Sequence, residues 1–143
     1  MATSAFGGPA CGEQGRRELP AAPWSVRVSR ANAARPAMEV YAAGTLLGVV
    51  VATPLSPGLL SGARRTVWAG QHRAIAWGRV VGSRSGIAVR FSRGRPGRAE
   101  HAAEVIGVAE WFWVALADGR FAAVTATYQG IAEKLRVPPA RTS

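Results

Sequence analysis

Glu39 and His72 are the two candidates for acid–base chemistry in this sequence. A carboxylate or an imidazole can accept a proton during a reaction when its surroundings adjust its pKa. His72 stands between Trp68 and Trp77 in an arginine-rich stretch, and Glu39 precedes a long uncharged segment. Each also has a structural interpretation, His72 as a surface or core histidine and Glu39 as a helix-dipole partner. Catalysis by Glu39 and His72 is therefore one hypothesis, and a structural role for each is the alternative.

Basic residues are concentrated in one segment of the chain. The 143 residues carry a formal net charge of +10. Residues 64–98 contain nine arginines and no acid, so they account for +9 of it. Clustered guanidinium groups attract phosphates through their field and through bidentate hydrogen bonds. We expect Arg90, Arg93, Arg95 and Arg98 to bind the phosphates of a ligand, with a solvated surface as the alternative.

Standard catalytic and metal-binding motifs are missing from the sequence. The spacing Gly-x-Ser-x-Gly does not occur, because Gly82 and Gly86 bracket an arginine and indicate a turn. Cys11 is the single cysteine, and the two histidines are far apart in the sequence, so we expect no metal site. Asp118, followed by glycine, is explained by turn geometry.

Length and composition predict one domain. A chain near 150 residues can bury a core of its own, and 48% of the residues are apolar. We expect a domain over 24–137, with tails at 1–23 and 138–143. The first 23 residues lack the apolar run of a secretory signal, which favours a cytoplasmic protein. Because 17 of the 18 basic residues are arginine, a non-functional product of GC-rich coding is a further alternative.

The segment 37–52 predicts a long apolar helix. Pro36 suits a first helical position, Glu39 lies in the first turn, and Pro54 follows the end. A helix that is apolar on all sides is buried in a protein or lies in a membrane. The 24 residues from 40 to 63 carry no charge, but glycine, serine and proline interrupt them. A buried helix is therefore preferred to a membrane span over 40–60, although Val49, Val50 and Val51 in a row could equally form a buried strand.

The last third of the chain predicts antiparallel strands. Residues 103–108 read as a strand, and 111–117 and 120–128 read as a hairpin joined by Asp118-Gly119, a strong two-residue turn signal. Both faces of 111–117 are apolar. We expect that strand to lie inside a sandwich, under the helix or at an oligomer interface.

The order of these elements resembles the hotdog fold of acyl-CoA thioesterases and related dehydratases. The resemblance is carried by residues 103–107 and 114–128, which look like the closing strands, and by Gly44–Gly48, which looks like part of the central helix. Ala33-Ala34-Arg35-Pro36 stands where the family frequently has His-Gly-Gly. The resemblance implies an α+β fold with one long apolar helix on an antiparallel sheet, and a homodimer.

Two functions follow as expectations. The resemblance implies an acyl-CoA thioester hydrolase or an acyl-CoA-binding protein, with Glu39 or His72 as the base and arginines on the phosphates of coenzyme A. The basic segment alone favours a non-catalytic β-rich module that binds nucleic acid or another polyanion. We expect neither a resident cofactor nor a membrane partner in either case.

Overall fold

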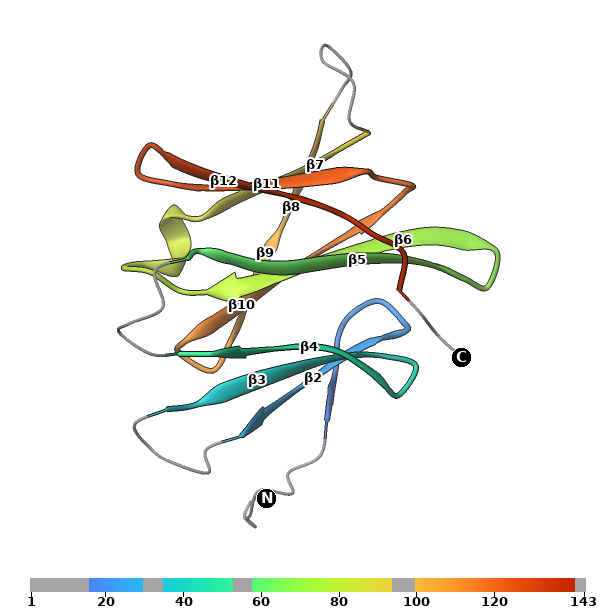
Figure 1. Ribbon diagram of the computed structural model, residues 1–143, viewed down its shortest axis with the longest axis horizontal. Coiled ribbons are helices and arrows are strands. Elements are labelled where there is room, and N and C mark those ends of the chain that lie inside the picture. Colours follow the sequence, from blue (N-terminus) through green and yellow to red (C-terminus); the bar gives the residue numbers. More distant parts are fainter. Residues whose placement is uncertain (1–15, 30–34, 53–57, 94–99, 141–143) are drawn as a thin grey trace.

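The computed structural model describes residues 16–29, 35–52, 58–93 and 100–140, and it is built almost entirely from β-strands (Figure 1). Twelve strands form three four-stranded antiparallel sheets within these ranges. The predicted α+β fold, with a hotdog-like helix on a sheet, is therefore wrong. The one helical element in the described residues is the short 3-10 turn η2 (Arg84–Gly86). No helix in this part of the chain is long and apolar enough to cross a membrane.

The first sheet is a meander in chain order. Its strands are β1 (Arg17–Glu18), β2 (Trp24–Ser29), β3 (Ala37–Ala42) and β4 (Thr45–Val51). Strand β1 lies inside the segment 1–23 that the sequence places in a tail, and Leu19 just after it is buried.

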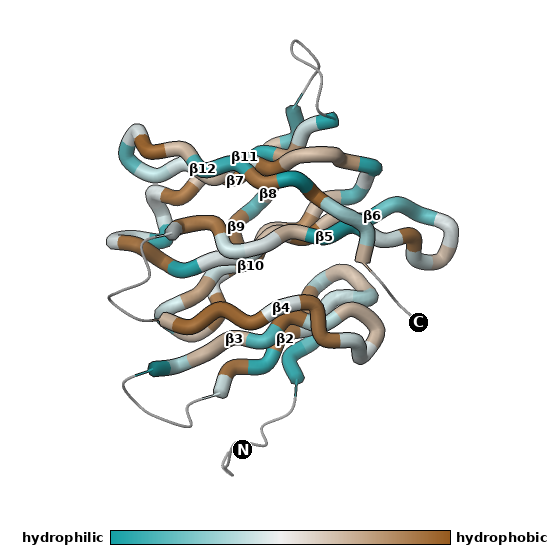
Figure 2. Tube along the Cα trace, in the orientation of Figure 1, coloured by the Kyte–Doolittle hydropathy of each residue, from teal (hydrophilic) through white to brown (hydrophobic). Residues whose placement is uncertain are grey.

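The predicted helix over 37–52 is wrong because this segment is the hairpin of β3 and β4. Ala43 and Gly44 both have positive φ angles, of 49° and 85°, which is the geometry of a two-residue type I′ turn. In β3, buried Met38 and Val40 alternate with the more exposed Glu39. Strand β4 is one of the longest apolar stretches in Figure 2, and its β-branched Val49–Val51 favour a strand. Glu39 therefore has no helix dipole beside it.

From β5 onwards, successive pairs of strands belong alternately to a second and a third sheet. The second sheet contains β5 (Leu60–Trp68), β6 (Gln71–Arg79), β10 (Phe112–Asp118) and β9 (Val105–Val108), in that spatial order. The third contains β12 (Ile131–Arg136), β11 (Ala123–Tyr128), β7 (Ala88–Ser92) and β8 (His101–Ala103).

The hairpin predicted at Asp118-Gly119 is wrong. Strand β10 pairs with β6 and β9, whereas β11 pairs with β7 and β12, so the two segments belong to different sheets. The Gly119 N–H donates to the His72 carbonyl at 2.8 Å, which ties the connection to β6. Asp118-Gly119 thus carries the chain from one layer to the next.

Strand β10 in the second sheet is buried on both faces, as predicted for residues 111–117. Figure 1 shows this sheet between the other two sheets. One core lies between the first and second sheets and includes Met38, Val40, Ile75, Trp77 and Phe112. The other lies between the second and third sheets and includes Ala74, Ala76, Phe91, Trp113 and Val124. Of the three arrangements considered for this strand, the interior of a sandwich is the one observed.

The second and third sheets are connected at two edges. At one edge the chain runs directly from β8 into β9 through Glu104, so it passes from the third sheet to the second. At the other edge Arg65 in β5 forms a parallel bridge with Pro139. The Arg65 N–H donates to the Pro138 carbonyl at 2.9 Å, and the Ala140 N–H donates to the Arg65 carbonyl at 2.7 Å. These bonds satisfy edge groups that would otherwise stay unpaired.

Candidate anion-binding cleft

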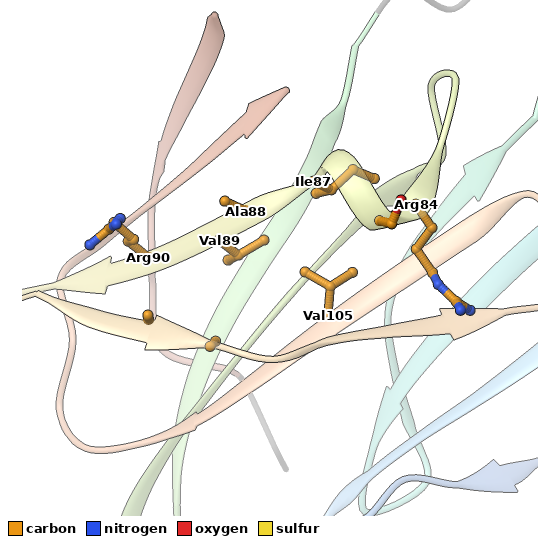
Figure 3. Close-up of a pocket in the computed structure, with 9 residues that line it drawn as sticks. Arg84, Ile87, Ala88, Val89, Arg90 and Val105 are labelled. Carbon is orange, nitrogen blue, oxygen red and sulfur yellow. The ribbon is translucent and has the colours of Figure 1, made fainter. Parts of the chain in front are cut away.

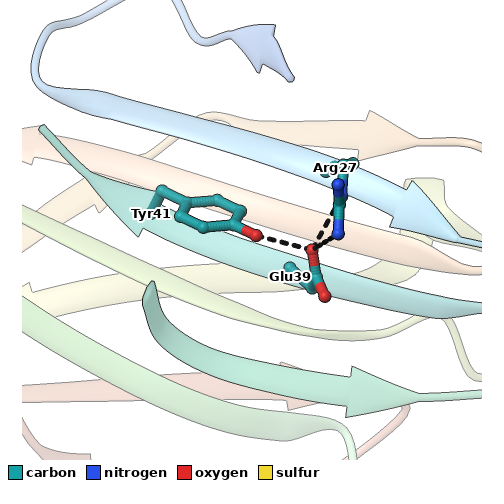
Figure 4. A network of polar contacts seen from close by, with 3 residues as sticks. All are labelled: Arg27, Glu39 and Tyr41. Atoms are coloured by element: carbon teal, nitrogen blue, oxygen red, sulfur yellow. Dashed lines mark hydrogen bonds and ion pairs between the residues drawn. The ribbon is translucent and has the colours of Figure 1, made fainter. Parts of the chain in front are cut away.

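Glu39 lies on the outer face of the first sheet and is held by two donors (Figure 4). Its Oε1 accepts a hydrogen bond from the Tyr41 hydroxyl at 2.6 Å and one from Arg27 Nε at 2.8 Å. The Tyr41 hydrogen bond lowers the pKa of Glu39, Arg27 lowers it further, and partial burial opposes both. A carboxylate with a lowered pKa is a weaker base. This geometry fits the structural interpretation of Glu39, now as an ion-pair partner.

His72 lies on a different sheet from Glu39. It is the second residue of β6, is exposed, and stands opposite Val67 in β5. Glu39 is on the face of the first sheet that points away from β6, since its neighbours Met38 and Val40 fill the core between them. The structure therefore does not bring the two predicted catalytic residues together.

The predicted phosphate-binding arginines are only partly placed. Arg90 is exposed on β7. Arg93 follows that strand, and its guanidinium carbon lies 5.7 Å from the centre of the Phe121 ring. Arg95 and Arg98 lie outside the described residues. Of the two that the structure describes, Arg90 lines a cleft between β7 and β9.

The cleft opens where β7 and β9 separate. Strand β7 pairs with β8 from Phe91 to Val89, and the chain then turns at Glu104 into the second sheet. Figure 3 shows the two strands diverging from the end near Arg90. The space between them has a volume of about 380 Å³, within the usual range for small-molecule sites. Its lining residues are Arg84, Ser85, Ile87, Ala88, Val89, Arg90, Ala102, Ala103 and Val105.

Arg84 stands at the opposite end of the cleft from Arg90 (Figure 3). It comes from η2, whose short turn follows the positive-φ Gly82. Gly107 in β9 makes room for its side chain, because a Cβ there would lie 1.9 Å from Arg84 Nη1. Arg17 also reaches this glycine, since its Nη1 donates to the Gly107 carbonyl at 3.4 Å.

Sequence reasoning missed Arg84 as a site residue because the segment 82–86 was interpreted as a turn alone. That turn is present, and it is what presents the side chain. The pairing of Arg84 with Gly107 joins residues far apart in the sequence, and no local spacing signals it.

The cleft combines positive charge with an apolar floor. Ile87 and Val89 are buried beneath it, and Val105 is half-buried. No acid, histidine or cysteine is among the described residues that line it. No hydrogen bond or ion pair joins the side chain of Arg84 or of Arg90 to another described residue. Arg84 and Arg90 thus stand at the two ends of a cleft with an apolar floor. Because neighbouring residues of a strand point to opposite faces, the Arg90 side chain extends away from Val89.

The described part of the chain also contains a smaller pocket, lined by His101, Glu104 and Asp118 together with apolar residues. No cluster of three or more His, Cys, Asp or Glu side chains in this described part could hold a metal ion. No family model, curated protein or solved structure matches this chain. The function is therefore argued from the geometry of the cleft.

Proposed function

We propose that this protein is a non-catalytic β-rich module that binds a phosphate-bearing ligand in the cleft between β7 and β9. The observation that carries the proposal is the pair Arg84 and Arg90, two guanidinium groups without acidic partners at the two ends of one apolar cleft. Guanidinium groups bind phosphate with charge-assisted, often bidentate hydrogen bonds. The apolar floor favours a ligand with a hydrophobic part beside its phosphates.

Coenzyme A and its acyl esters have the chemistry that this cleft would recognise. They carry phosphates at one end and, when acylated, an apolar chain at the other. Inorganic phosphate has the charge alone, and a fatty acid has the chain with a single carboxylate. Comparing these three ligands separates the contributions of charge and apolar surface.

Binding without catalysis is preferred to thioester hydrolysis because the cleft supplies no base. The one hydroxyl among its described residues, Ser85 Oγ, shares a hydrogen bond with Ser83 Oγ at 2.9 Å. Nucleophilic activation of a serine needs an adjacent general base. Glu39 and His72, the predicted bases, do not line the cleft.

Titration calorimetry with acyl-coenzyme A tests the proposal. Arg84→Gln and Arg90→Gln are each expected to weaken binding by about tenfold, the effect of losing one charge-assisted hydrogen bond. Arg120→Gln and Arg136→Gln are matched controls, because both arginines are exposed and lie outside the cleft. Affinity should also fall as salt is added.

Two results would contradict the proposal. The first is an absence of binding, or an equal loss with the control variants. The second is release of free thiol from acyl-coenzyme A that Glu39→Gln or His72→Gln abolishes, which would support the hydrolase hypothesis instead.

A further inference from the structure

The turn between β5 and β6 reaches further along the long axis of the molecule than the neighbouring strand ends (Figure 1). It consists of Ala69 and Gly70, with φ angles of 52° and 80°. A Cβ added to Gly70 would meet no other atom within 4 Å. The tip of this hairpin therefore stands free of the rest of the described structure.

The tip carries one exposed apolar side chain on each face, opposite a polar residue of β6: Val67 faces His72, and Trp68 faces Gln71. Val67 is 57% exposed and Trp68 is 40% exposed. Successive residues of a strand point to opposite faces, so these two side chains flank the turn from both sides. Residues 66–71 include no Asp, Glu, Lys or Arg. An exposed tryptophan and valine beside an uncharged turn cost solvation free energy unless a partner covers them.

Basic side chains lie behind this tip. Arg64 and Arg65 are in β5, and Arg73 is in β6. Arg65 is three residues from Trp68, which corresponds to roughly 10 Å along a strand. The acid that accompanies them is Asp118, whose Oδ1 lies 3.7 Å from Arg73 Nε. Three arginines and one aspartate leave a net positive charge at the base of the apolar tip.

We propose that the β5–β6 hairpin tip docks this protein on the surface of a membrane that contains anionic lipids. Tryptophan prefers the interface between headgroups and acyl chains. Interfacial apolar groups insert by roughly 5–10 Å, which would bring the arginines behind the tip level with the lipid phosphates. Docking is peripheral and independent of the cleft between β7 and β9.

A single-stranded nucleic acid fits the tip less well. Such ligands stack successive bases on several aromatic side chains, whereas the hairpin segment 64–73 has one ring on each face, Trp68 and, opposite Val67, His72. Val67 offers no ring for stacking, but it inserts readily between lipids. The observations therefore favour a lipid surface.

Co-sedimentation with phosphatidylcholine vesicles, with and without phosphatidylserine, tests the docking. The full chain is expected to bind vesicles that contain phosphatidylserine, and Val67→Ser combined with Trp68→Ser is expected to abolish binding. Ile131→Ser is the matched control, because Ile131 is 62% exposed beside the similar turn Gln129-Gly130. Arg64→Gln should weaken binding by about fivefold, as for loss of one basic residue near an anionic surface. Circular dichroism confirms that each variant is folded.

Quenching by brominated lipids provides a second measurement. Trp24, Trp77 and Trp113 are at most 3% exposed. The partly buried Trp111 precedes β10 at the end of the second sheet away from the β5–β6 turn. The quenched signal should therefore come from Trp68 and disappear in Trp68→Phe. Arg84→Gln should leave vesicle binding unchanged, which separates this site from the cleft. Equal binding to neutral vesicles would overturn the proposal. So would vesicle binding that survives loss of Val67 and Trp68, or loss of oligonucleotide binding alone in that variant.

Discussion

At the residue scale, the best-defined polar group is Glu39, which pairs with Arg27 and accepts a hydrogen bond from Tyr41. Its lowered pKa, caused first by the Tyr41 hydrogen bond, means that the folded state prefers the carboxylate. A group whose pKa is lower in the folded state stabilises the protein above its unfolded pKa. That contribution is lost as the pH falls through the folded pKa.

Glu39→Gln should therefore lower the free energy of unfolding at neutral pH. The expected loss is about 1 kcal/mol or less, because Arg27 is partly exposed and the pair is screened by solvent. The difference from the native protein should disappear once the pH is below the folded pKa. Urea unfolding at several pH values measures this, and Tyr41→Phe should reproduce part of the loss. A deficit that stays constant down to acid pH would show that the charge of Glu39 does not cause it.

At the element scale, three hairpins each have a two-residue turn in which both residues have a positive φ angle. These turns are Ala43-Gly44, Ala69-Gly70 and Gln129-Gly130. Left-handed backbone costs roughly 1–2 kcal/mol in residues with a Cβ, and asparagine tolerates it better than alanine or glutamine. Ala43→Asn and Gln129→Asn should each stabilise the protein by about 0.5 kcal/mol. Ala43→Val should do the opposite, and thermal unfolding of the three variants checks the order.

The same turns explain why sequence reasoning gave a helix for 37–52. Alanine-glycine is a weak turn signal beside Asn-Gly or Asp-Gly, so the apolar run looked continuous. The signal that could have separated the two is the β-branched run Val49–Val51. At Asp118-Gly119 the stronger turn signal was misleading, because tertiary pairing of β10 with β6 and β9 decided the sheet.

At the scale of the whole molecule, two cores share one sheet. The second sheet carries Trp77 on the face of one core and Trp113 on the face of the other. We expect one cooperative unfolding transition, since neither outer sheet can lose its packing without exposing the middle one. Met38→Ala and Phe91→Ala, one in each core, should each lower the free energy of unfolding by about 3 kcal/mol and leave a single transition in urea unfolding. Two separate transitions, each shifted by one variant, would contradict this.

The position of the candidate cleft could not be predicted from the sequence. Charge counting indicated a patch of arginines in 64–98, and one of those singled out, Arg90, lines the cleft. Arg84 lines the same cleft for two reasons. The chain passes from the third sheet to the second at Glu104, and Gly107 in β9 leaves room for the Arg84 side chain. Such a juxtaposition arises from long-range strand pairing, which a single sequence does not display. The burial of both faces of 111–117 was predictable, because a strand apolar on both sides needs two partners.

The sheet order also bears on how the chain folds. The first sheet is a meander of neighbouring strands with short loops, so its pairing is local and fast. Its inner face is Val26, Met38 and Val40, which pack only against a sheet completed by β10, some seventy residues later in the chain. We therefore expect the local hairpins to form first, with their apolar surface still exposed. The non-local pairing of β6 with β10 should be slower. The rate-limiting barrier should lie at that pairing, and chaperone demand should be greatest before it.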